Sequence, residues 1–105
     1  MLLDPANWSL HLDLADVRAE QGDFAAAASL AEQGLEHGPH EVSLRAAGAA
    51  YRTRASGCPD DLRALIALAP EVANTTYRNL LIDYACARPE LPQRLVAQAR
   101  RIRTD

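Results

Sequence analysis

The stretch LADVRAEQGDFAAAASLAEQGLEHGP, residues 14–39, decides the fold of this 105-residue chain. It contains two runs with apolar residues at helical spacing, separated by Gly22-Asp23 and closed by Gly38-Pro39. A glycine commonly ends a helix, and a Gly-Pro pair both ends one helix and allows the next to begin. The stretch therefore predicts two helices joined by a short turn.

Five sets of residues recur along the chain at intervals of 33 positions. The sets are His11, Leu44 and Tyr77; Leu14, Ala47 and Leu80; Ala15, Gly48 and Leu81; Arg18, Tyr51 and Tyr84; and Ala31, Ala64 and Ala97. A period of roughly 20–50 residues is typical of proteins that stack one supersecondary unit repeatedly. We therefore expect one domain over residues 1–105, with repeats at approximately 5–40, 41–73 and 74–105.

The first unit resembles a tetratricopeptide repeat (TPR). The residues that carry the resemblance are Leu14, Ala15, Gly22, Phe24, Ala27 and Pro39. Arg18 and Ala31 stand where this family usually has aromatic residues, and the later units depart from the pattern in their second helices, where Pro59 and Pro92 replace Ala26. The resemblance implies an all-α fold: a right-handed solenoid of about three helical hairpins, or six helices.

Helix starts are marked by capping residues and prolines. The expected starts are Asp4-Pro5, Asp23, Pro39, Pro59, either Pro70 or Asn74, and Pro92. The third helix contains the run Ala46-Ala47-Gly48-Ala49-Ala50, which has almost no side-chain bulk. Gly48 in a helix interior costs about 1 kcal/mol relative to alanine, so we expect it to serve close packing of a neighbouring helix.

Charge is divided unevenly between the two ends of the chain. Residues 1–41 hold eight acidic residues and one arginine, a net charge of −7, whereas residues 42–105 hold ten arginines and six acidic residues, a net charge of +4. Neither end has a clear polar capping helix, so Leu3, Trp8, Leu95 and Ile102 are expected to be exposed. This pattern predicts either self-association through the ends or a chain that is a segment of a longer protein.

No group of residues in the sequence converges on catalytic or metal-binding chemistry. His37 and His40 lack further zinc ligands, and His11 lies on a different helix face from Ser9 and Asp13. We therefore expect a protein that is not an enzyme and needs no cofactor or metal. The basic C-terminal end lacks stacking aromatics and the pI is near 5.5, which disfavours nucleic acid.

Cellular location is predicted from what the chain lacks. It has no apolar stretch of membrane-spanning length and no export signal, and Cys58 and Cys86 are isolated. We expect a cytoplasmic protein that does not enter membranes. Every basic residue is arginine and alanine is abundant, a composition associated with GC-rich bacteria.

The resemblance also implies a concave groove lined by first-helix residues. Those positions correspond here to Leu12, Asp16, Arg45, Ala49, Arg52, Arg78, Asn79 and Ile82. Leu12 and Asp16 are unsuited to the carboxylate clamp of some relatives, but Arg45 and Arg78 occupy equivalent positions and predict an acidic partner.

Two functions follow from this interpretation. The first is a non-catalytic scaffold that binds a partner protein or peptide in the concave groove. The second is an accessory or oligomerisation segment of a larger bacterial enzyme, such as a transferase.

Overall fold

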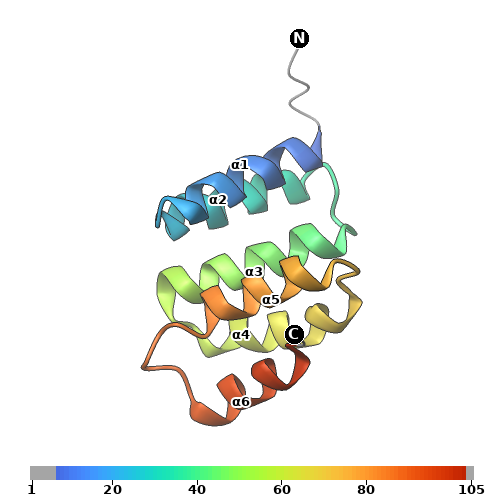
Figure 1. Ribbon diagram of the computed structural model, residues 1–105. Helices are drawn as coiled ribbons and strands as arrows, with labels where there is room; N and C mark the ends of the chain where they lie inside the picture. Colours follow the sequence, from blue (N-terminus) through green and yellow to red (C-terminus); the bar gives the residue numbers. More distant parts are fainter. Residues whose placement is uncertain (1–6, 104–105) are drawn as a thin grey trace.

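The computed structural model describes residues 7–103, and within that range the chain is helical, with no β-strand (Figure 1). The elements are α1 (Trp8–Glu20), α2 (Phe24–Leu35), α3 (Val42–Ser56), α4 (Pro59–Leu68), the 3₁₀ turn η1 (Ala69–Glu71), α5 (Thr75–Ala85) and α6 (Gln93–Ile102). The all-α fold class and the number of six α-helices agree with the sequence-based prediction.

Polar caps determine where several helices begin. The side chain of Asn7 accepts a hydrogen bond from the Ser9 amide at 3.0 Å, so α1 begins at Trp8; the predicted start at Asp4-Pro5 lies outside the described residues. Asp23 caps α2 in the same way. Asn74 caps α5, which decides between the two predicted starts of that helix, because Pro70 lies in η1.

Helix α3 occupies the centre of the fold. It packs against α2 on one side, α4 on another and α5 on a third, and it also touches α1. All five residues of the run from Ala46 to Ala50 are buried. Because these residues carry at most a methyl group, the neighbouring helices can approach the α3 backbone from several directions.

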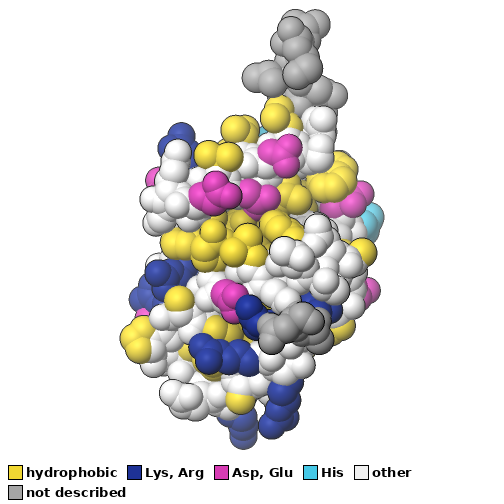
Figure 2. Space-filling view, in the orientation of Figure 1, with side chains coloured by type: hydrophobic (Ala, Val, Ile, Leu, Met, Phe, Trp, Pro, Cys, Tyr) yellow, Lys and Arg dark blue, Asp and Glu magenta, His cyan; other side chains and the backbone are white. Residues whose placement is uncertain are grey.

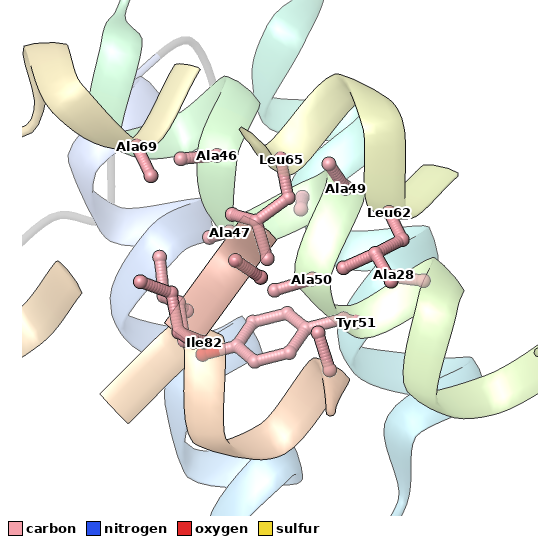
Figure 3. Packing of buried hydrophobic residues seen from close by; sticks show 14 of the residues in the cluster. Ala28, Ala46, Ala47, Ala49, Ala50, Tyr51, Leu62, Leu65, Ala69 and Ile82 are labelled. Carbon is pink, nitrogen blue, oxygen red and sulfur yellow. The ribbon is translucent and has the colours of Figure 1, made fainter. Parts of the chain in front are cut away.

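Larger side chains fill the space that the alanines leave (Figure 3). Tyr51 on α3, Leu62 and Leu65 on α4, and Ile82 on α5 are almost completely buried and surround the alanine run. The core therefore combines many methyl-sized contacts with a few large residues.

The last two helices do not form a closed hairpin. Helix α5 packs mainly on α3, and α6 packs on α4, with little contact between α5 and α6. The connecting segment 86–92 contains Pro89 and Pro92, and the Arg88 guanidinium donates hydrogen bonds to the Arg54 and Ala55 carbonyl oxygens at the end of α3. This anchor holds the segment against α3, so the expected third hairpin is open.

The 33-residue period does not predict burial uniformly. At one repeat position the residues of all three units, Ala15, Gly48 and Leu81, are buried. In contrast, Ala47 is buried while its equivalents Leu14 and Leu80 are exposed, because only α3 has neighbours on every side.

The two ends of the molecule also differ from each other. Leu95 on α6 is buried and Ile102 is half-buried, contrary to the expectation that both would be exposed. At the other end Trp8 is half-buried and packs over Gly38, while Leu3 lies outside the described residues. The exposed large apolar residues of the first helix are instead Leu14 and Val17.

The closest helix approach occurs at Gly34 rather than at Gly48. A methyl group added to Gly34 would lie 2.9 Å from the His11 Cβ and 3.1 Å from a Leu44 methyl group. The same group on Gly48 would meet the movable end of Arg52 at 3.2 Å and the Ala31 Cβ at an ordinary 3.6 Å. Gly34 is therefore the residue that lets α2 pack tightly between α1 and α3.

We predict that Gly34→Ala lowers the free energy of unfolding by about 1–3 kcal/mol, the usual effect of overpacking a core. The matched change Gly48→Ala should leave stability unchanged or raise it by up to about 1 kcal/mol, since alanine is the better helix former. Chemical denaturation of both variants measures the two effects. Equal losses would show that the two glycines are packed alike.

Candidate functional site

A carboxylate on α1 joins three helices. The Tyr51 hydroxyl of α3 and the Tyr77 hydroxyl of α5 both donate hydrogen bonds to Asp16 Oδ1, at 2.5 Å and 2.7 Å. The donors lie 35 and 61 residues from Asp16 in the sequence. These contacts fix α1 against α5, although the two helices belong to the first and the last repeat.

Aromatic rings continue this junction toward the C-terminal end of α1. The ring centroids of Phe24 and Tyr84 lie 5.2 Å apart in an edge-on arrangement, and that of Tyr51 lies 6.1 Å from Tyr84. The Arg54 guanidinium lies 5.1 Å from the Phe24 ring centroid. Edge-on rings and a cation over an aromatic face are both favourable, so these contacts stabilise the inner side of the junction.

Burial changes the protonation of these groups. Desolvation raises the pKa of Asp16, and the hydrogen bonds from Tyr51 and Tyr77 oppose that rise. Desolvation also raises the pKa of Tyr51 and of Tyr77, with a further rise from the Asp16 charge, so both phenols remain protonated donors at neutral pH. Desolvation, followed by the charges of Glu20 and Asp16, raises the pKa of Tyr84.

The solvent-facing side of the junction combines apolar and acidic groups. We call it the α1–α5 surface, and its residues are Asp13, Asp16, Glu20, Tyr77, Leu80 and Tyr84. Leu80 lies one helical turn from both Tyr77 and Tyr84 and is 41% exposed. Figure 2 shows a hydrophobic band below α1 that is bordered by acidic side chains.

The structure disperses the predicted groove residues. Leu12, Asp16 and Asn79 are half-buried, whereas Ala49 and Ile82 have no exposed surface and cannot touch a partner in this conformation. Among these five, Asp16 belongs to the junction, because it accepts hydrogen bonds from Tyr51 of α3 and Tyr77 of α5.

The predicted arginines differ in exposure and in partners. Arg52 forms ion pairs with Glu32 of α2 and Asp61 of α4, at 3.5 Å and 3.1 Å. Arg45 is exposed and lies two turns earlier on the same side of α3. Arg78 is half-buried on α5. A cationic groove formed by these arginines stays a prediction.

The 33-residue period places Tyr51 and Tyr77 at repeat positions, but it did not reveal that both residues contact α1. The sequence held one indication: Asp16 lies on a first helix, and tyrosines recur at two sets of the 33-residue period. Nothing in the spacing shows that Tyr51 and Tyr77 meet the same carboxylate oxygen.

Other candidate residues are occupied or isolated. The His11 ring nitrogen lies 3.0 Å from the Asn7 carbonyl oxygen, and the Ser9 hydroxyl donates a hydrogen bond to the Asn7 side chain at 2.8 Å. Cys58 is half-buried, and burial raises the pKa of the Cys86 thiol.

Three structural features are absent from residues 7–103. No group of three or more His, Cys, Asp or Glu side chains is arranged to hold a metal ion. No pocket is enclosed within this range, and none of its helices combines the length and the apolar character needed to cross a membrane. A comparison with protein-family models, curated proteins and solved structures found no match to this chain.

We predict that Asp16 makes stability depend on pH. Its pKa is raised above 3.8 in the folded protein, so its contribution to the free energy of unfolding is fully present below pH 3.8 and is lost as the pH rises through the folded pKa. The unfolding free energy of Asp16→Asn minus that of the wild type should therefore rise as the pH increases from 3.8 to the folded pKa of Asp16, and it should level off above that pKa.

Denaturation with urea at a series of pH values measures this difference. Glu71→Gln, which removes an exposed carboxyl in η1, serves as the matched control for the loss of one carboxyl. A parallel profile for Asp16→Asn would contradict the desolvation of Asp16.

The two tyrosine hydroxyls should also be coupled to Asp16. Hydrogen bonds to a charged group contribute about 1.5–3 kcal/mol, so Tyr77→Phe should lower stability by up to that amount. In an Asp16→Ala background the same change should have a smaller effect, because the acceptor is absent. A double-mutant cycle measures the coupling, and additive losses would show that the hydrogen bond contributes little.

Proposed function

We propose that this chain is a protein-interaction module that binds a partner peptide or protein at the α1–α5 surface. The exposure of Leu80 beside two tyrosines and an acidic helix edge carries this proposal. Tyrosine is enriched at protein interfaces, where its ring supplies contact area and its hydroxyl supplies hydrogen bonds.

The inner contacts of the surface support this use. Asp16 and the Phe24–Tyr84 ring pair hold α1 and α5 in a defined relation, so the side chains above them are already positioned before a partner arrives. A preorganised surface loses less conformational entropy on binding than a flexible one.

The charges of the surface favour a basic partner rather than the acidic partner expected from sequence. Asp13 and Glu20 are exposed at its edge, while Arg52 is paired elsewhere and Arg45 lies on another side of α3. The matching ligand is a segment with an apolar side chain for the Leu80 region and a nearby lysine or arginine for the acids.

We also propose that the fold is a degenerate form of the TPR-like solenoid. The consecutive packing of α1 on α2, α2 on α3 and α3 on α4 supports this arrangement, as does the position of α5 beside α3. In that arrangement α1, α3 and α5 would line the concave side, which includes the α1–α5 surface.

Selection of a random peptide library on the immobilised chain tests the proposed function. We predict that enriched peptides combine an apolar residue with lysine or arginine. Leu80→Ser should weaken their binding by about tenfold, since burying a leucine contributes roughly 1.5–3 kcal/mol. Leu14→Ser removes a comparably exposed leucine outside the α1–α5 surface and should leave peptide affinity unchanged.

Fluorescence anisotropy with an enriched peptide measures these affinities. Enrichment of acidic peptides, or equal affinity for the wild type and Leu80→Ser, would overturn the proposed surface. Binding should also weaken with salt, because the exposed acids are screened over a Debye length of about 10 Å at ~0.1 M.

A further inference from the structure

The outer face of α1 is an apolar surface that no described helix covers. Ala15 and Ala19 mark the buried side of this helix, and Val17 lies between them in sequence, so its side chain points away from the core. Leu14 and Val17 are 46% and 48% exposed, more than Leu80. This face lies at one end of the molecule, beyond the α1–α5 surface (Figures 1 and 2).

The opposite end of the molecule presents a basic helix. Helix α6 contains three arginines and no acidic residue. Its buried side is formed by Leu95 and Ala99, while Arg94 and Arg101 are exposed. Ala97 lies between these two arginines and is also exposed. Because its side chain is only a methyl group, the helix surface has room there for a side chain of another molecule.

The charges on the two ends match in sign and in spacing. Asp13 and Glu20 are exposed on α1 seven residues apart, and Arg94 and Arg101 are exposed on α6 at the same separation. Seven residues correspond to two turns and a rise of about 10 Å, so both pairs lie along one side of their helices. Helix α1 of one copy placed beside α6 of another copy could therefore form both ion pairs at once.

We propose that a second copy of this chain docks head to tail, with the outer face of α1 against the outer face of α6 in the next copy. Leu14 and Val17 contact Ala97 and the aliphatic parts of the arginines, while the acids and arginines pair along the edge. The contact is heterologous, so it continues into open chains or closes into a ring.

Charge argues against the simplest alternative, a two-fold pair of antiparallel α1 helices. In such a pair the same edge of each helix meets its own copy, which would bring Asp13 and Glu20 of both chains together. Like charges at this distance repel each other. The head-to-tail arrangement instead brings opposite charges together.

The contact is small, and this determines how it should be measured. One helix face against another buries less than the roughly 1,200–2,000 Å² of a stable interface. We therefore expect weak association that grows from micromolar to millimolar protein and weakens with salt. Sedimentation velocity of the full chain over this range should show species larger than a dimer.

Charge reversal supplies the decisive test. Asp13→Arg with Glu20→Arg makes both ends basic, and Arg94→Glu with Arg101→Glu makes both ends acidic, so each variant alone should remain monomeric. A mixture of the two should associate again, because each basic end then meets an acidic one. Circular dichroism should show that both variants retain the wild-type helix content.

The apolar part of the contact is tested separately. Leu14→Ser with Val17→Ser should abolish association, whereas Leu80→Ser, which changes another exposed leucine on α5, should leave it unchanged. Peptide affinity should instead fall in Leu80→Ser and stay unchanged in Leu14→Ser with Val17→Ser. Failure of self-association and failure of the proposed function can therefore be told apart.

Three results would overturn the proposal. One is a wild-type chain that remains monomeric at millimolar concentration and low salt. Another is a mixture of reversed variants that does not associate. The third is assembly that stops at a two-fold dimer, which would indicate contact between like ends.

Discussion

The close packing of helices around α3 is the constraint on which the rest of this structure depends. A central helix with three strongly packed neighbours must have little side-chain bulk, and the run from Ala46 to Ala50 meets that requirement. Large residues such as Leu62 and Leu65 are then supplied by the surrounding helices. The backbone approach is closest where α2 passes between α1 and α3, at Gly34.

A second consequence of this packing is that α1 and α5 lie on neighbouring sides of α3. Asp16 can then accept hydrogen bonds from both Tyr51 and Tyr77, although a carboxylate in a partly buried position is costly without such donors. The same contacts that offset this cost also position Leu80 and Tyr84 at the surface. The proposed partner surface is thus a direct product of how the core is assembled.

The distribution of exposed groups gives the molecule two different ends. Helix α6 buries its apolar side on α4 and turns its arginines outward, which is the usual character of a terminal capping helix. Helix α1 has no comparable cover for Leu14 and Val17. Together with the acidic edge of α1, this asymmetry is the basis of the proposed head-to-tail contact between copies of the chain.

The sequence by itself determined the helical fold class, most of the helix boundaries and the small-residue character of α3. These features depend on local chemistry: helical periodicity, the caps Asp23 and Asn74, and the prolines that open helices. It did not determine which equivalent positions are buried. Leu14, Ala47 and Leu80 share one repeat position, but burial depends on how many helices surround each one.

Only the tertiary structure decided the site. The Asp16 junction joins residues up to 61 positions apart. A 33-residue period shows that positions are equivalent along the chain, but it cannot give the rotation of each helix about its own axis. That rotation is set by packing, which buries Ala49 and Ile82 of the predicted groove and leaves Asp13, Glu20 and Leu80 exposed.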